Sequence, residues 1–194
     1  MKRVLIIDDH EPSRKTLVKT LTQNGYEIAG EGASGETAVA LTATTSPDIV
    51  LMAVGLSDID GIKAAGNIMQ AKPLPIILIT SHHDSTTVQR ATKSGAMGYL
   101  IKPLRNGELS PAIELAISRF RDFLSLREEN QALKENLVER KVIERAKGML
   151  MEQKSWTEEQ AYSLMKKASM NMRKPMADIA EAIILTGGLL KIKS

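Results

Sequence analysis

The chain of 194 residues contains no cysteine, only three histidines and few aromatic residues: two phenylalanines, three tyrosines and one tryptophan. The absence of cysteine excludes a disulfide framework, a thiolate zinc site, an iron–sulfur cluster and thiol catalysis. Three histidines leave little material for an imidazole-based metal site. With so few aromatic rings, the hydrophobic core has to be built from leucine, isoleucine, valine, alanine and the ten methionines.

Long apolar runs are also missing. No segment approaches the roughly 18 apolar residues that a membrane-spanning helix needs. The run Val4–Ile7 is too short for the core of a signal peptide, and Asp8 follows it at once. Because 43% of the residues are hydrophobic and 25% are charged, the composition is that of a folded globular protein. We expect a soluble, cytoplasmic protein with no membrane partner.

Positive charge is concentrated near the C-terminal end. Residues 1–119 carry twelve basic and twelve acidic side chains, whereas residues 140–174 carry nine basic and only four acidic ones. A basic segment beside a neutral one indicates an anionic partner for the C-terminal part. An ordinary solvated helix surface stays open as the alternative.

The first 120 residues alternate between short apolar runs and amphipathic stretches. Apolar runs of this length are typical of buried parallel strands, and the stretches between them have helical spacing. This alternation predicts an α/β fold, a doubly wound five-stranded parallel sheet with helices on both faces. The expected strands are Val4–Ile7, Tyr26–Ala29, Asp48–Met52, Ile76–Thr80 and Gly98–Ile101, with helices after Pro12 and over Gly35–Ala43, Gly61–Met69 and Ser85–Ser94.

Polar side chains stand where several of these strands end. In a doubly wound sheet, ligands bind at the carboxyl ends of the strands. Two carboxylates at that edge would hold Mg²⁺, and a hydroxyl and an ammonium would hydrogen-bond the oxygens of a phosphoryl group. The residues at this edge are Asp8, Asp9, Ala53, Thr80 and Lys102.

Residues 1–120 resemble the receiver domain of response regulators. The matching pieces occur in the family's order and are Ile6–Asp9, Pro47–Met52 with the loop Val54–Gly61 after it, Ile76–Thr80 and Gly95–Pro103. The resemblance implies the flavodoxin-like receiver fold. It also implies that Thr80, Tyr99 and Lys102 are the switch threonine, the switch aromatic residue and the signature lysine.

The same resemblance implies a cation site and an unusual peptide bond. Asp8, Asp9 and the carbonyl of Gly55 would approach a divalent cation. The bond between Lys102 and Pro103 would be cis.

The central residue of the receiver family is missing. The position after the third strand normally holds the aspartate that accepts the phosphoryl group, and here it is Ala53. A methyl group neither attacks phosphorus nor ligates a cation, so we expect only weak Mg²⁺ binding. Two interpretations stay open: a natural pseudo-receiver that works without phosphorylation, or an engineered Asp-to-Ala change. If the native residue is an aspartate, a sensor histidine kinase is an expected partner.

Gly30, Gly32 and Gly35 have the spacing of a dinucleotide-binding fingerprint. They follow the second strand, however, whereas that fingerprint belongs to the first strand–helix turn. We interpret the three glycines as a glycine-rich turn.

One long helix is predicted in the second half, because residues 112–153 contain no proline and a single glycine. We expect it to begin with Ser110 as N-cap and Pro111 as the first helical residue. Five residues then recur at heptad spacing, and one asparagine among apolar a and d positions favours two parallel strands. This stripe predicts a parallel homodimer, with a single amphipathic linker helix as the alternative; its members are Phe123, Leu126, Asn130, Leu133 and Leu137.

Shorter helices are expected after the long one. Thr157 and Gln160 have the spacing of a capping box, and Pro175 suits the first position of a further helix. Roughly residues 135–186 resemble the ANTAR domain, the RNA-binding module of transcription antitermination regulators. The matching pieces are Arg140–Leu150, Thr157–Tyr162, Ala168–Met170 and Ile179–Ala180. We expect three parts: a receiver at 1–120, a coiled-coil linker helix at 121–139 and a small three-helix all-α ANTAR-like domain at 140–194.

This second resemblance implies that the protein binds RNA hairpins and promotes transcription antitermination. Basic side chains would neutralise RNA phosphates, and Tyr162 or Trp156 would stack on an unpaired base unless it belongs to the core. The candidate phosphate contacts are Lys141, Arg145, Lys147, Lys166, Lys167, Arg173 and Lys174.

Two other functions stay open at this point. One is a DNA-binding transcriptional regulator that uses the helices as a helix-turn-helix, although no tight glycine-containing turn joins two adjacent helices. The other is a pseudo-receiver that binds only proteins. Nothing in the sequence forms a nucleophile–base pair, so we do not expect an enzyme.

Overall fold

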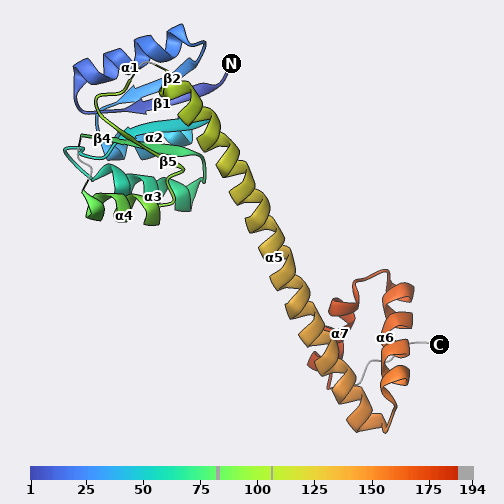
Figure 1. The fold of residues 1–194 in the computed structure, drawn as a ribbon. Coiled ribbons are helices and arrows are strands. Elements are labelled where there is room, and N and C mark those ends of the chain that lie inside the picture. Colours follow the sequence, from blue (N-terminus) through green and yellow to red (C-terminus); the bar gives the residue numbers. More distant parts are fainter. Residues whose placement is uncertain (82–83, 106, 188–194) are drawn as a thin grey trace. The chain divides into compact units, whose positions relative to one another are not determined.

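The computed structural model describes residues 1–81, 84–105 and 107–187, and the chain forms two compact units, Met1–Leu124 and Ser125–Ser194. The first unit is a five-stranded parallel sheet with helices on both faces, as the sequence predicts (Figure 1). Its spatial strand order is β2-β1-β3-β4-β5. The chain places β2 on one side of β1 and β3 on the other side. This change of side leaves a crevice at the carboxyl ends of β1 and β3. The strands are β1 (Arg3–Ile7), β2 (Glu27–Gly32), β3 (Ile49–Ala53), β4 (Ile76–Thr80) and β5 (Gly98–Ile101).

Alternating side chains of the strands build two hydrophobic layers, one on each face of the sheet. Leu5 and Ile7 belong to one layer, and Val4 and Ile6 belong to the other, as the two-residue period of a strand requires. The first layer packs against α2 (Gly35–Thr45), α3 (Gly61–Ala71) and α4 (Ser85–Lys93). The second layer packs against α1 (Glu11–Gln23) and the beginning of α5 (Leu109–Lys154).

Several predicted element ends are displaced by a few residues. The second strand is Glu27–Gly32, because the amide of Tyr26 still donates to the carbonyl of Leu21 at the end of α1. Ser110 is not the N-cap of α5: this helix already begins at Leu109, since the amide of Ala112 donates to the carbonyl of Glu108.

The second unit contains the C-terminal part of α5 together with α6 (Glu158–Met172) and α7 (Met176–Leu185). Thr157 and Gln160 form the predicted capping box at the start of α6. Pro175 is the N-cap of α7 rather than its first residue. The small core of this unit is made by Ala146, Leu150, Ala161, Met165, Ala168, Ile179, Ala180 and Ile183.

Within the described ranges, no helix combines the length and the apolar composition that crossing a membrane requires.

Candidate functional sites

The receiver unit has a pocket of about 840 Å³ where the strands end. It lies at the edge that the sequence predicts, because the residues that follow β1, β3, β4 and β5 all contribute to its wall. Asp9, Ala53, Gly55, Thr80 and Lys102 line it, together with His10, Pro12, Ser13, Thr16, Leu17, Ile79, Ser81, Pro103 and Leu104. The structure therefore brings five of the predicted receiver residues together around one space, whereas Asp8 and Tyr99 are not part of its wall.

Asp8 lies beneath this pocket and is 1% exposed. Its Oδ1 atom accepts a hydrogen bond from the amide of His10 at 3.1 Å. Its Oδ2 atom accepts from the hydroxyl of Ser13 at 2.8 Å and from the ammonium of Lys102 at 2.5 Å. Both carboxylate oxygens thus have protein donors, and one of these donors is itself a cation.

This arrangement is a poor fit for a divalent cation. Asp8 already accepts hydrogen bonds from His10, Ser13 and Lys102, and Asp9 is the one carboxylate among the residues that line the pocket. Ala53 supplies no oxygen from its side chain. Among the residues that the structure describes, no group of three or more His, Cys, Asp or Glu side chains is placed to hold a metal ion.

The two residues matched to the receiver switch lie on neighbouring strands, Thr80 at the end of its strand and Tyr99 near the start of the next. Thr80 is the last residue of β4, is 5% exposed, and its carbonyl accepts from the amide of Lys102 at 2.7 Å. Tyr99 is in β5 opposite Leu78 and is half-buried against the first hydrophobic layer. The peptide bond between Lys102 and Pro103 is cis, which confirms the implied isomer.

The loop after β3 is held by contacts that the sequence analysis missed. Asp58 accepts hydrogen bonds from the first two amides of α2, those of Gly35 at 2.8 Å and Glu36 at 2.9 Å. The amide of Glu36, followed by that of Gly35, lowers the pKa of Asp58 to about 2. The start of α2, where a fingerprint would bind a pyrophosphate, is thus capped by a carboxylate of the chain itself.

A second aspartate of this loop connects two helices. Asp60 is the N-cap of α3, since its side chain accepts from the amide of Ile62, and it also forms an ion pair with Arg90 of α4. Neither this ion pair nor the contact of Asp58 with the first amides of α2 has a local signal, because the partners are distant in sequence.

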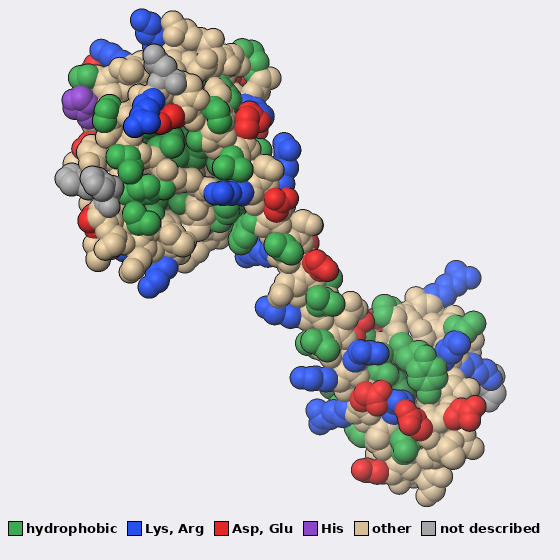
Figure 2. Space-filling model, viewed as in Figure 1, with side chains coloured by type: hydrophobic (Ala, Val, Ile, Leu, Met, Phe, Trp, Pro, Cys, Tyr) green, Lys and Arg blue, Asp and Glu red, His purple; other side chains and the backbone are tan. Residues whose placement is uncertain are grey.

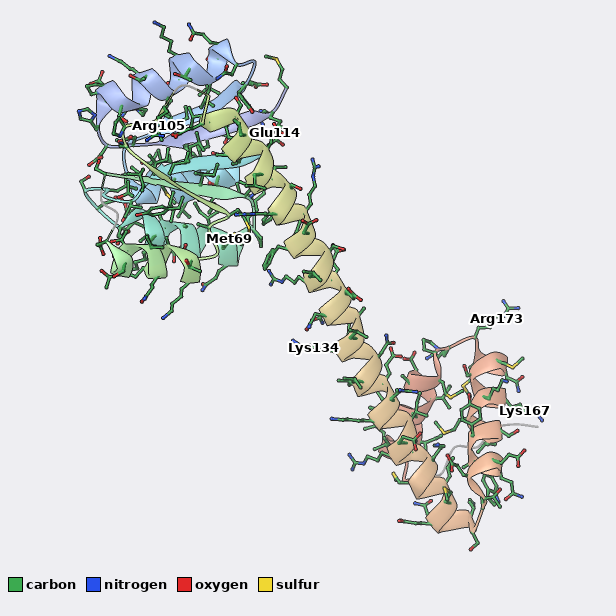
Figure 3. All side chains as sticks on the ribbon, in the orientation of Figure 1. Met69, Arg105, Glu114, Lys134, Lys167 and Arg173 are labelled. Carbon is green, nitrogen blue, oxygen red and sulfur yellow. The ribbon has the colours of Figure 1, made fainter. Side chains whose placement is uncertain are left out.

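Basic side chains are exposed on several elements of the second unit. Lys141 and Arg145 lie one turn apart on α5, and Lys166 and Lys167 are neighbours on α6. Figure 2 shows Lys and Arg side chains projecting from this unit on the face in view, interspersed with acidic ones. Figure 3 shows Lys167 and Arg173 directed away from the body of the unit. The exposed members of the predicted set are Lys141, Arg145, Lys166, Lys167, Arg173 and Lys174.

Lys147 differs from the other six. Its side chain is only 9% exposed, and its ammonium lies 2.8 Å from Glu144 and 2.6 Å from Glu158. The Glu144 and Glu158 carboxylates raise the pKa of Lys147. Since Glu158 is in the first turn of α6, the ion pair connects α5 to α6. This geometry favours a structural role for Lys147.

Two exposed basic residues are neighbours in the turn between α6 and α7. Arg173 ends α6 in the left-handed region, with φ of 52°. The amide of Lys174 donates to the carbonyl of Ser169, and the Ser169 hydroxyl donates to the carbonyl of Lys174 at 2.6 Å. The backbone of Lys174 is therefore fixed while its side chain stays exposed.

Apolar side chains of the predicted heptad stripe are exposed along α5. Phe123 is 37% exposed, Leu126 is 65% exposed, Leu133 is 57% exposed and Leu137 is 56% exposed. Asn130, between them, is exposed as well. Four large apolar side chains in a row on one helix are typical of a surface that packs against another chain.

Comparisons with known proteins agree with this division of the chain. Residues 4–114 match the family model of the response regulator receiver domain, and residues 131–184 match that of the ANTAR domain. The signal receiver domain of a modulated diguanylate cyclase from Desulfovibrio desulfuricans G20 is similar to the first unit, with a TM-score of 0.59 and 36% identity. That match covers 62% of this chain and 97% of the solved chain.

Two curated relatives show how far the similarity extends. LiaR of Bacillus subtilis, a transcriptional regulatory protein, is 38% identical over 118 residues, which are 60% of this chain and 56% of LiaR. PdtaR of Mycobacterium tuberculosis, also a transcriptional regulatory protein, is 41% identical over 190 residues, which are 98% of this chain and 93% of PdtaR. Because the similarity to PdtaR runs through both units, the chain belongs to the response regulators of two-component signalling that join a receiver domain to an ANTAR domain.

Proposed function

We propose that this response regulator binds RNA hairpins as a dimer and promotes transcription antitermination. The observation that carries the proposal is the set of six exposed basic side chains on the helical unit that matches the ANTAR model. RNA phosphates attract such a surface through release of their counterions. The stems of hairpins supply phosphates at close spacing, and their loops supply unpaired bases that side chains can contact.

The dimer in this proposal forms through α5. Two parallel copies of the stripe from Phe123 to Leu137 would bury the exposed leucines against one another, and the two Asn130 side chains would pair at one layer. Such a dimer presents two copies of the basic surface. An RNA with two hairpins would engage both copies at once and would gain affinity from the high effective concentration of the second site.

The receiver unit, in this proposal, does not take up a phosphoryl group at position 53. Ala53 has no nucleophilic atom, and Lys102 neutralises Asp8 in the pocket. A sensor kinase that docks on this receiver would find no acceptor at that place. If the alanine is an engineered change, the protein with aspartate restored by Ala53→Asp would be the natural partner of such a kinase.

Relatives give little support to a DNA-binding alternative. LiaR is similar to this chain only over the length of a receiver domain, whereas the helical unit matches the ANTAR model. The other alternative is a receiver that binds only proteins. It would give no role to the six exposed basic side chains of the helical unit.

Titration of the full-length protein with a hairpin RNA and with a DNA duplex of equal length, at two salt concentrations, tests the proposal. We expect the hairpin to bind more tightly, and its affinity to fall steeply as salt rises. A variant with both Lys141→Met and Arg145→Met should bind the hairpin more weakly, whereas the control Lys19→Met, an exposed lysine of α1, should not. Equal affinity for hairpin and duplex, or no binding of either, would contradict the proposal.

A further inference from the structure

The pocket of the receiver unit has a size and a lining that suit a small organic ligand. Its volume of about 840 Å³ falls in the range of roughly 300–1,000 Å³ that such ligands occupy in proteins. Much of its wall is apolar, and Ala53 adds a methyl group where the receiver family carries a carboxylate. The apolar side chains of the wall are Pro12, Leu17, Ala53, Ile79, Pro103 and Leu104.

Several polar groups of this pocket already have partners within the chain. The hydroxyl of Ser13 donates to Asp8 at 2.8 Å, and the ammonium of Lys102 lies 2.5 Å from the same carboxylate. The hydroxyl of Thr16 donates to the carbonyl of Pro12 at 2.8 Å. Because Asp8 and Lys102 cancel each other's charge, this pair gives the pocket no net charge.

Asp9 is the charged group of the wall that stays unpaired. It is exposed, and within the described part of the chain its carboxylate has neither an ion pair nor a hydrogen bond. The neighbouring His10 adds no positive charge, because its Nδ1 atom accepts from the amide of Ser13 at 3.3 Å and a protonated imidazole has no acceptor. The negative charge of Asp9 is therefore not compensated by its neighbours in the wall.

The basic side chains of the first turns of α1 do not compensate it either, since they have acidic partners of their own. Lys15 pairs with Glu11 at 2.6 Å, and Arg14 pairs with Glu31 at 3.4 Å.

These charges favour a ligand that carries one positive charge. A carboxylate ligand would be repelled by Asp9 and would have to share Lys102 with Asp8. A divalent metal ion needs more oxygen ligands than the pocket offers. An alkylammonium group has three donors, so it can bond to Asp9 and to the exposed hydroxyl of Ser81, which also lines the pocket. An apolar body attached to it would be removed from water against the apolar wall.

We propose that the receiver pocket binds a small organic amine in its ammonium form, with the nitrogen at Asp9 and the apolar body against Leu17 and Leu104. This inference goes beyond the proposed function, because it concerns the receiver unit and holds whether or not the C-terminal unit binds RNA. A receiver without a phosphoryl acceptor would in this way respond to a dissolved ligand.

The methyl group of Ala53 reports directly on the pocket, because it is part of the wall. The full-length protein is isotope-labelled in its alanine methyl groups for NMR, and the Ala53 signal is identified by its loss in Ala53→Ser. Titration with benzylamine should shift this signal until it saturates. Methylamine has the charge without the apolar body, and phenylacetate has the body with a carboxylate. We expect both to bind at least about tenfold more weakly than benzylamine.

Two exposed aspartates supply the matched variants. Asp9→Asn should weaken benzylamine binding about tenfold, because the ammonium loses its carboxylate partner. Asp122→Asn removes an equal charge outside the pocket and should leave the affinity unchanged.

Three results would overturn the proposal: no shift of the Ala53 signal with benzylamine, binding of phenylacetate that is equal or tighter, or equal benzylamine affinity of Asp9→Asn and the unsubstituted chain. Saturation of the same signal by Mg²⁺ at lower concentration than by benzylamine would also overturn it, since the pocket would then still be a metal site.

Discussion

The ammonium of Lys102 lies 2.5 Å from the Oδ2 atom of Asp8, at the edge of the sheet where a receiver would bind a phosphoryl group. Asp8 is 1% exposed at its side chain and Lys102 is 23% exposed, so the pair is largely removed from water. The two charges neutralise each other. A chain with this pair and no acidic side chain at position 53 has neither an acceptor for a phosphoryl group nor a free cation ligand at Asp8.

The first prediction concerns position 53. Ala53→Asp should let the protein accept a phosphoryl group from a small donor such as acetyl phosphate, because it restores a nucleophile and a third carboxylate beside Asp8 and Asp9. Incorporation of label in the presence of Mg²⁺ measures this. Ala53→Asn, which has the same shape but no nucleophilic carboxylate, is the control and should stay unlabelled, as should the unsubstituted chain. Absence of label on the Ala53→Asp variant would mean that the rest of the pocket has lost its receiver chemistry.

The second prediction concerns acid stability. The pKa of Asp58 is lowered to about 2 in the folded protein, against about 3.9 in an unfolded chain. A carboxylate with a depressed pKa stabilises the fold above its unfolded pKa, and this contribution is lost as the pH falls from about 4 to about 2. Asp58→Asn should therefore weaken the pH dependence of the unfolding midpoint in this window.

Urea unfolding of both proteins at several pH values between about 2 and 7 provides the measurement. Asp122→Asn is a suitable control, since this exposed aspartate of α5 has no hydrogen bond or ion pair among the described residues. Identical pH profiles for the unsubstituted chain and Asp58→Asn would show that the hydrogen bonds between Asp58 and the start of α2 do not contribute.

The third prediction compares two glycines of α3. A Cβ atom at Gly61 would lie 2.0 Å from the carbonyl oxygen of Ala53, whereas a Cβ atom at Gly66 would meet nothing within 4 Å. Gly61→Ala should destabilise the first unit by at least ~2 kcal/mol, because the backbone of the loop after β3 has to move. Gly66→Ala should stabilise the helix by about 0.5–1 kcal/mol. Chemical unfolding of the two variants measures both effects, and a stable Gly61→Ala protein would show that the loop is not tightly fixed.

The fourth prediction separates two basic residues of α5. Arg145→Met should weaken RNA binding and reduce the slope of log affinity against log salt by about one, because an exposed phosphate contact is lost. Lys147→Met should lower the melting temperature, because Glu144 and Glu158 lose their partner, yet it should leave the salt slope nearly unchanged. Equal reductions of the salt slope in the two variants would show that Lys147 also contacts an RNA phosphate.

Most of the fold follows from local patterns in the sequence. The parallel sheet was predictable because its central strands are continuous apolar runs such as Ile76–Thr80, and α6 was predictable from the capping box of Thr157 and Gln160. The start of α5 was predicted too late in the chain, because Ser110 followed by Pro111 has the local form of a helix start. Leu109 packs into the core, and the helix therefore begins at Leu109, before Ser110.

The sequence predicts which residues meet at the receiver pocket, but not the hydrogen bonds and ion pairs between them. Strand order alone brings Asp8, Ala53, Thr80 and Lys102 to one edge. Pairing of Lys102 with Asp8 depends on side-chain geometry, which sequence spacing does not contain. For the same reason the sequence does not distinguish Lys147 from its exposed neighbours: burial of a lysine between two helices depends on how those helices pack.

The central claim, a dimer with two RNA-binding surfaces, is tested most directly by comparing the affinity of the full-length protein for a one-hairpin RNA and for a two-hairpin RNA. We expect the two-hairpin RNA to bind about a hundredfold more tightly or better, because the second site then binds at high effective concentration. Leu133→Glu, which puts a charge into the stripe of α5, should abolish this gain and keep the one-hairpin affinity, whereas Gln131→Glu, beside the stripe, should keep the gain. Equal affinity of the unsubstituted chain for the two RNAs would contradict the claim.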